Sequence, residues 1–189
     1  YKRQVQAVGP EVNSVKAGQQ VLVFPWIGCG ECDACNENRE SDCAAMRIIG
    51  LKQKGGFATH CLVENDKFLV DIDGLDAADV VPHACSGITV FNALEKMGAL
   101  RSDEWIAIMG CGGLGMNAIS IAGAMGFNNI IAVDIDNGKL EAALEMGATK
   151  VLNSKNDDAV SELQKLAEGR LMGVLDTFGG SETGRIACL

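Results

Sequence analysis

The first eighty residues combine short apolar runs with frequent turn-forming residues. Residues 4–10 alternate between polar and apolar side chains and end in Gly-Pro, and residues 21–25 form a second apolar run. Residues 57–63, which follow a Gly-Gly pair, and residues 68–70 form two more. Apolar stretches separated by Gly, Pro and polar clusters are typical of β-strands joined by turns. This pattern predicts an all-β region.

After about residue 82 the pattern changes to strands that alternate with helices. Continuous apolar runs such as residues 105–109 predict strands buried on both faces, and the spacing of Leu114, Ala118 and Ile121 predicts a helix with an apolar stripe. The expected strands are 105–109, 130–133, 151–152 and 173–175, and the expected helices are 88–97, 114–125, 140–147 and 159–167. Such alternation indicates an α/β fold, with a doubly wound parallel sheet covered by helices on both faces.

The composition is that of a soluble globular protein with a net negative charge. The 189 residues are 48% hydrophobic, and 25 acidic residues against 16 basic ones give a formal net charge of −9. Nucleic-acid binding needs clustered Lys and Arg, so we expect no nucleic-acid partner. No apolar run reaches the ~18 residues of a membrane span, and the opening residues do not resemble a secretory signal. We therefore expect a cytoplasmic protein without a membrane partner.

Four of the eight cysteines crowd into fifteen residues. Cys29, Cys32, Cys35 and Cys43 form the pattern C-x2-C-x2-C-x7-C. Four thiolates at such spacing complete a tetrahedral zinc shell with no open position, so the pattern predicts a structural zinc rather than a catalytic one. An iron–sulfur cluster and four unrelated free cysteines are the alternatives. The two C-x2-C pairs of a nucleic-acid zinc ribbon, roughly 15–20 residues apart, are absent.

A glycine-rich turn follows the expected strand at 105–109. Gly110, Gly112 and Gly115 form G-x-G-x-x-G, and the helix stripe begins inside the motif. In this context the glycines allow a tight turn, a close approach of the backbone to a pyrophosphate and close helix–strand packing. The helix N-terminus adds free N–H groups for the phosphates. The alternative is a glycine-rich turn that binds no cofactor.

An acidic residue ends the next expected strand. Asp134 lies nineteen residues after Gly115, where a carboxylate can accept hydrogen bonds from the adenosine ribose of a dinucleotide. It would repel a 2′-phosphate, so the sequence favours NAD over NADP, and Asp136 adds a second negative charge. The alternative role for Asp134 is to cap the following helix.

Together these motifs resemble one known family. They are C-G-x-C-x-x-C-x7-C at 29–43, C-S-G-x-T-V-F at 85–91, G-x-G-G-L-G at 110–115 and V-D-I-D at 133–136. The chain resembles the zinc-dependent medium-chain alcohol dehydrogenases, and residues 21–35 are similar to the 6-hydroxyhexanoate dehydrogenase-like branch. The resemblance implies a partial GroES-like β domain over residues 1–82, with a zinc lobe at 29–43. A partial Rossmann domain would follow over residues 83–189.

The resemblance also assigns site residues. Cys85 matches a ligand of the family's catalytic zinc, and Thr89 matches a residue that packs against the nicotinamide. The residues matching the cofactor site are Gly110, Gly112, Gly113, Leu114 and Gly115 at the pyrophosphate, Asp134 and Lys139 at the ribose, and Phe178 and Gly179 on the adenosine side. His83 and His60 match no metal ligand of the family and are expected to be structural.

The implied activity is hydride transfer between an alcohol and NAD, with a primary or ω-hydroxy alcohol as substrate. A zincless reductase of the same superfamily and a non-enzymatic redox sensor that binds zinc and a dinucleotide are the alternatives. The family's other catalytic-zinc ligands would precede Tyr1, so we expect an internal fragment. Alone it should bind about one zinc, at the four-cysteine lobe, and show no activity. The full-length protein is expected to form a homo-oligomer.

Overall fold

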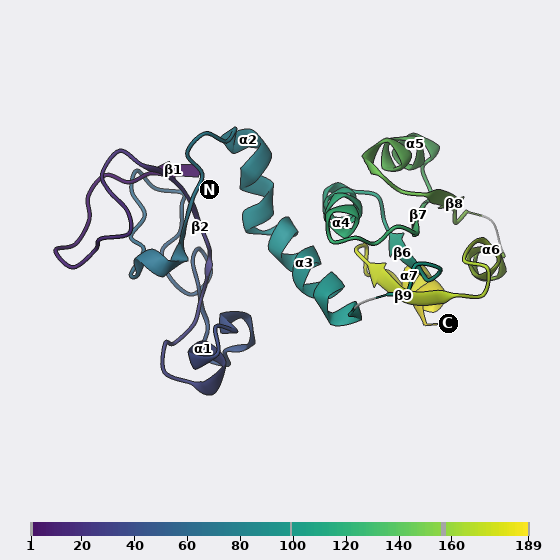
Figure 1. Cartoon of the computed structure of the whole chain (residues 1–189), viewed down its shortest axis with the longest axis horizontal. Coiled ribbons are helices and arrows are strands. Elements are labelled where there is room, and N and C mark those ends of the chain that lie inside the picture. The colour runs from purple at the N-terminus through teal and green to yellow at the C-terminus, as the bar shows by residue number, and fades with distance from the viewer. Residues whose placement is uncertain (1, 99, 156–157, 189) are drawn as a thin grey trace. The chain divides into compact units, whose positions relative to one another are not determined.

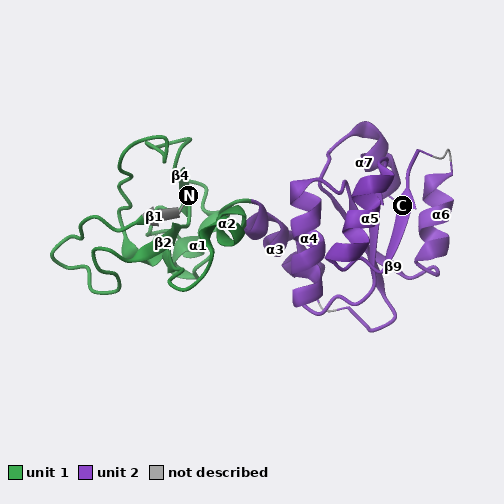
Figure 2. Ribbon diagram, turned by 90° about the horizontal axis from the view of Figure 1, so that it is seen from above, with its two compact units in different colours: residues 1–85 green, residues 86–189 purple. Residues whose placement is uncertain are grey.

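The computed structural model describes residues 2–98, 100–155 and 158–188, which form two compact units (Figure 2). Unit 1 comprises Tyr1–Cys85 and unit 2 comprises Ser86–Leu189, whereas the sequence pattern predicts domains of 1–82 and 83–189. No helix in the described part of the chain is long and apolar enough to cross a membrane.

Unit 1 is built on two small antiparallel sheets. The first joins β1 (Lys2–Gln4) and β2 (Gln20–Val23), both labelled in Figure 1, to β5 (Leu69–Asp71), and the strand order is β1-β2-β5. The second pairs β3 (Trp26–Ile27) with β4 (Arg47–Ile48). The predicted runs at 21–25 and 68–70 thus become the paired strands β2 and β5.

Short helices lie between these strands and after the last of them, and two apolar clusters fill the unit. Val23, Ile27 and Phe68 pack together in one cluster, and Leu22 and Ile72 belong to the other. The helices are α1 (Asp33–Asn36), η1 (Glu40–Asp42), η2 (Asp66–Phe68), α2 (Ala77–Val80) and η3 (Val81–Ala84), the three η elements being 3-10 turns.

The strand predicted at residues 57–63 is wrong. These residues have no strand pairing, and the side chains of Phe57, His60 and Leu62 are exposed. A short apolar run between turn residues is not sufficient for a strand, because the backbone must also find a partner to pair with. Residues 59–66 instead line a cavity of about 740 Å³ together with residues 4–9.

Unit 2 contains a four-stranded parallel sheet with the order β8-β7-β6-β9. Its strands are β6 (Trp105–Met109), β7 (Ile130–Asp134), β8 (Lys150–Asn153) and β9 (Leu171–Asp176). Every residue of β6 and β7 is buried, because both strands are central and covered on both faces. The predicted strands and their parallel arrangement are confirmed.

Helices cover both faces of this sheet (Figure 1). They are α3 (Ser86–Met97), α4 (Gly113–Ala124), α5 (Asn137–Met146), α6 (Ala159–Leu166) and α7 (Ser181–Ala187). Ile106 and Ile108 of β6 face a core completed by α3, α4 and α5. Trp105, Ala107 and Met109 face the opposite core, completed by α6 and α7. The four predicted helices are confirmed, whereas α7 was not predicted.

Candidate functional sites

The four clustered cysteines converge in unit 1. Cys29 follows β3, Cys32 and Cys35 lie at the start and inside α1, and Cys43 ends η1. Their four sulfur atoms lie within 4.8 Å of one another. The Sγ atom of Cys35 is 3.9 Å from that of Cys29 and 3.5 Å from that of Cys32. A tetrahedral zinc with Zn–S bonds of about 2.3 Å would separate its sulfurs by about 3.8 Å, so the cluster fits this ion.

The electrostatics of the cluster also favour a cation. Backbone amides of Glu31 and Cys32 lower the pKa of the Cys29 thiol to about 6. The amide of Cys35 acts in the same direction on Cys32, but hydrogen bonds with the thiols of Cys35 and Cys29 outweigh it and raise the pKa of Cys32 to about 11. The thiol of Cys29 is thus readily ionised while that of Cys32 keeps its proton, because the hydrogen bonds favour the charged form of the first and the neutral form of the second. A bound divalent cation favours the thiolate form of all its ligands.

The lobe depends on close packing and on one ion pair. A side chain at Gly28 would place its Cβ 2.4 Å from the Cys35 sulfur, so only glycine fits beside the cluster. The carboxylate of Glu40 accepts a 2.6 Å hydrogen bond from the Lys67 ammonium, which lowers the pKa of Glu40. This pair joins η1 of the lobe to η2, next to the sheet of unit 1.

The glycine-rich turn lies at the carboxyl end of β6 in unit 2. Gly110 has φ +88°, a conformation that L side chains rarely adopt. A Cβ at Gly115 would lie 1.8 Å from the Gly110 carbonyl oxygen, so helix α4 can approach the strand only through glycine. A Cβ at Gly112 or Gly113 would meet nothing within 4 Å, so this side of the turn is open.

The open side coincides with the N-terminus of α4. Gly112 is the N-cap, followed by Gly113, Leu114 and Gly115 in the first turn. The first N–H groups of a helix have no partner within the helix, and its dipole favours anions there. The charge and the space at this helix N-terminus therefore both suit a pyrophosphate.

Asp134 ends β7 beside the glycine turn. Its side chain is buried, and its residue is 8% exposed. Oδ2 accepts a 2.7 Å hydrogen bond from the Cys111 amide, and Oδ1 accepts one of 3.0 Å from the Asp136 amide. The Lys139 ammonium is 4.0 Å from Oδ2. Asp134 does not cap α5, because Asp136 does so by accepting hydrogen bonds from the amides of Gly138 and Lys139.

The carboxyl end of β9 forms the other wall of the turn. Phe178 is 75% exposed, and its Cβ would lie 3.3 Å from a Cβ built at Gly110. The Asp176 carboxylate accepts hydrogen bonds from the amides of Phe178 and Gly179, which fixes the turn after the strand. The carboxyl ends of β6, β7 and β9 thus bring together the predicted dinucleotide-site residues from Gly110 to Phe178. Ligands of open α/β sheets bind at this edge.

Cys85, the one residue assigned to a catalytic zinc, lies outside the cluster of metal-ligand candidates in the described part of the chain. Cys85 follows η3 and is exposed in unit 1, and Thr89 is exposed on α3 of unit 2. Across residues 2–98, 100–155 and 158–188, the group of four cysteines is the only cluster of three or more candidate ligands. A catalytic zinc needs three protein ligands, so Cys85 alone does not fit one. His83 is exposed and lies outside the cluster.

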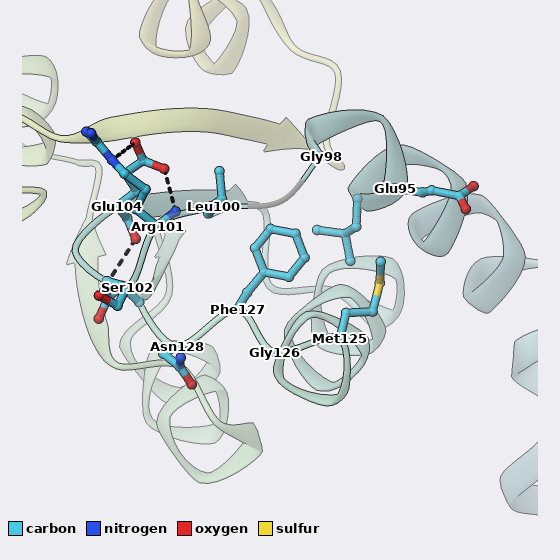
Figure 3. Close-up of a pocket in the computed structure, with 12 residues that line it drawn as sticks. Glu95, Gly98, Leu100, Arg101, Ser102, Glu104, Met125, Gly126, Phe127 and Asn128 are labelled. Carbon is cyan, nitrogen blue, oxygen red and sulfur yellow. Dashed lines mark hydrogen bonds and ion pairs between the residues drawn. The ribbon is translucent and has the colours of Figure 1, made fainter.

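A cavity of about 390 Å³ lies at the opposite edge of the same sheet, near the amino ends of β6 and β7 (Figure 3). Leu94, Met125 and Phe127 contribute apolar surface to it. On its rim, Arg101 pairs with Glu104 through a 2.9 Å contact between Nε and Oε1. The cavity is thus separate from the glycine turn, and these two rim charges satisfy each other.

Two protein-family profiles match the chain. The "Alcohol dehydrogenase GroES-like domain" matches residues 4–74, and the "Zinc-binding dehydrogenase" family matches residues 113–186. The chain is 38% identical over 167 residues to an alcohol dehydrogenase of Geobacillus stearothermophilus, covering 87% of this chain and 49% of that protein. It is 36% identical over 178 residues to an NAD-dependent alcohol dehydrogenase of Sulfurisphaera tokodaii, covering 94% and 51%. The chain therefore spans about half the length of the curated relatives it matches.

Solved structures show the same similarity. The alcohol dehydrogenase of the hyperthermophilic archaeon Aeropyrum pernix superposes with a TM-score of 0.84 at 27% identity, covering 94% of this chain and 53% of that one. An alcohol dehydrogenase from Thermus sp. ATN1 gives a TM-score of 0.85 at 25% identity, covering 99% and 56%.

Proposed function

Since this chain belongs to the zinc-type medium-chain dehydrogenase family, we propose that the protein oxidises an alcohol to an aldehyde or ketone with NAD as hydride acceptor. The observation that carries the proposal is the glycine turn with Asp134 beside it. The glycine turn after β6 suits the pyrophosphate of NAD, and the oriented Asp134 carboxylate at the end of the neighbouring strand β7 suits its ribose.

The role of this chain is to bind and orient the dinucleotide. NAD, when bound, supplies the hydride acceptor. The amides at the start of α4 would hold its pyrophosphate, and Asp134, with Lys139 nearby, would hold its ribose. Phe178 offers an exposed ring for the adenosine side. Asp134 would repel the 2′-phosphate of NADP.

The four-cysteine lobe would hold a structural zinc, and it distinguishes the main proposal from one of its alternatives, the zincless reductase. Zinc with four thiolate ligands has no position for substrate, so it would hold residues 29–43 together without taking part in hydride transfer. A zincless reductase has no need of this lobe. A redox sensor that binds zinc and NAD would lack alcohol turnover, and only an assay separates it from the enzyme.

A catalytic zinc in the active enzyme needs ligands beyond those present here. Cys85 is proposed as one ligand and Thr89 as a neighbour of the nicotinamide. For substrate we propose a primary or ω-hydroxy alcohol, as in the 6-hydroxyhexanoate dehydrogenase-like branch. We also propose a homo-oligomer that works in the cytoplasm, where thiols stay reduced and available for zinc.

Two measurements test the proposed function. Calorimetric titration of the 189-residue chain should show that NAD binds more tightly than NADP, and binding of neither would contradict the cofactor assignment. The protein at its natural full length should reduce NAD when given primary alcohols, and Cys85→Ser should abolish this turnover while Cys188→Ser, at another exposed cysteine, preserves it. Turnover that survives Cys85→Ser would contradict the role of Cys85.

A further inference from the structure

One threonine contacts the glycine turn from the neighbouring strand. Thr177 directly follows β9, and its Oγ1 lies 2.8 Å from the carbonyl oxygens of both Met109 and Gly110. Its amide also donates a 2.9 Å hydrogen bond to the Met109 carbonyl. These two carbonyls lie where the chain leaves β6 and enters the turn. The hydroxyl therefore donates its single proton where the turn begins.

Thr177 also packs against the glycines that shape the turn. Its Oγ1 would lie 3.0 Å from a Cβ at Gly110 and 3.2 Å from a Cβ at Gly115. The Gly110 carbonyl oxygen, which faces the Thr177 hydroxyl, is also the atom that a Cβ at Gly115 would strike. The hydroxyl thus sits at the point where strand, turn and helix α4 meet.

The peptide group between Gly110 and Cys111 is held from both sides. Its carbonyl lies within hydrogen-bond distance of Thr177 Oγ1, and its N–H donates the 2.7 Å hydrogen bond to Asp134 Oδ2. A peptide group is planar, so any rotation that frees the carbonyl also turns the N–H away from Asp134. The Thr177 hydroxyl and the Asp134 carboxylate are coupled through this one peptide plane.

A second network keeps Thr177 in place. The Asp176 carboxylate accepts hydrogen bonds from the amides of Phe178 and Gly179 through Oδ1, and from the Thr183 hydroxyl at 2.7 Å through Oδ2. The turn on either side of Thr177 is therefore fixed before any ligand arrives.

We propose that Thr177 is a positioning residue for the dinucleotide site, acting through the Gly110–Cys111 peptide on the orientation of Asp134. The proposal rests on the assignment of NAD to this turn. Thr177 need not touch the cofactor for this role. Its hydroxyl keeps the Cys111 amide directed at Asp134, so that the carboxylate meets the ribose in a single orientation.

The test compares two substitutions at Thr177 with a matched one elsewhere. Thr177→Val keeps the shape but removes the hydroxyl, and Thr177→Ser keeps the hydroxyl. The control is Thr149→Val, because the Thr149 hydroxyl likewise donates to a backbone carbonyl, that of Asn128, at the amino end of β7. Thr177→Val should weaken NAD binding roughly 5- to 10-fold, the effect of one lost hydrogen bond, while Thr177→Ser and Thr149→Val should bind as the unaltered chain does.

Hydrogen exchange of the Cys111 amide in the ligand-free chain supplies an independent readout. Thr177→Val should accelerate this exchange, and Thr149→Val should not. Unchanged exchange, or equal weakening of NAD binding by Thr149→Val, would overturn the positioning role. If the unaltered chain fails to bind NAD, the proposed function fails, while the exchange measurement still decides whether Thr177 holds the peptide.

Discussion

The amide of Cys111 donates a 2.7 Å hydrogen bond to Oδ2 of Asp134, which ties the glycine turn after β6 to the end of β7. The second oxygen of the same carboxylate accepts from the Asp136 amide. The carboxylate is therefore oriented by the backbone before any ligand binds, and ribose hydroxyls can use its remaining lone pairs. Preorganisation of this kind lowers the entropic cost of binding.

Replacing Asp134 should impair NAD binding more than folding. In Asp134→Asn the charge is lost, and a charge-assisted hydrogen bond of ~1.5–3 kcal/mol corresponds to a roughly 10- to 100-fold weaker Kd. Calorimetric titration with NAD and NADP measures the change, and the preference for NAD should shrink. The control, Asp136→Ala, removes the N-cap of α5 and should cost about 1 kcal/mol of stability with little change in NAD affinity. Equal effects of both variants on affinity would contradict the role of Asp134.

Two glycines of α4 should respond in opposite directions to the same substitution. Gly115→Ala forces a Cβ to within 1.8 Å of the Gly110 carbonyl oxygen and should destabilise the chain by about 1–3 kcal/mol while abolishing NAD binding. Gly123→Ala in the same helix meets open space and should stabilise it by about 0.5–1 kcal/mol. Urea denaturation of both variants measures this, and a tolerated Gly115→Ala would show that the helix can move away from the strand.

The chain should hold about one zinc, at the four-cysteine lobe. At free zinc about 100 times Kd, binding adds ~2.7 kcal/mol of stability, so chelation should lower the Tm of unit 1 by roughly 10 °C or more. Cys43→Ser should lose the metal, because it removes a buried ligand, whereas Cys188→Ser, at an exposed cysteine, should retain it. By itself the 189-residue chain should show no alcohol oxidation, because its described residues offer only Cys85 toward the three protein ligands of a catalytic zinc. Two tightly bound zinc ions per chain, or turnover of any alcohol, would refute this prediction.

The thiol of Cys111 should resist alkylation at pH 8. Burial, with the nearby Asp134 carboxylate, raises the pKa of Cys111 from 9.0 to about 11, and the residue is 2% exposed. A shift of this size lowers the thiolate fraction ~100-fold relative to an ordinary thiol. In the unfolded chain the Cys111 thiol ionises around pH 9, whereas in the folded chain it keeps its proton up to about pH 11. The stability that this difference provides is therefore fully present below pH 9 and is lost as the pH rises through about 11. Iodoacetamide labelling followed by peptide mass spectrometry checks this, with exposed Cys188 as reference. Equal labelling of the two cysteines at pH 8 would contradict it.

Features encoded by neighbouring residues could be predicted from the sequence. The spacing from Cys29 to Cys43 indicates a shared ion, because a short loop can bring its own side chains together. The apolar runs of β6 and β7 predict a parallel sheet, because only strands covered on both faces can be apolar throughout. The glycine motif predicts the turn, because the positive φ of Gly110 and the close approach of Gly115 to Gly110 both occur within six consecutive residues.

Other features depended on contacts between distant segments. The apolar run at residues 57–63 predicts a strand, but pairing requires a partner that the described residues do not supply. Thr177 belongs to no recognisable sequence motif. Its contact with the turn exists because β9 pairs with β6, which brings the Thr177 hydroxyl to the Gly110 carbonyl, 67 residues away in the sequence. The sequence by itself thus determined the local features, which are the cysteine lobe, the glycine turn and the acidic residue that ends β7. The tertiary structure decided how they are held together, because a hydrogen bond across a sheet depends on strand order and register, which local spacing does not encode.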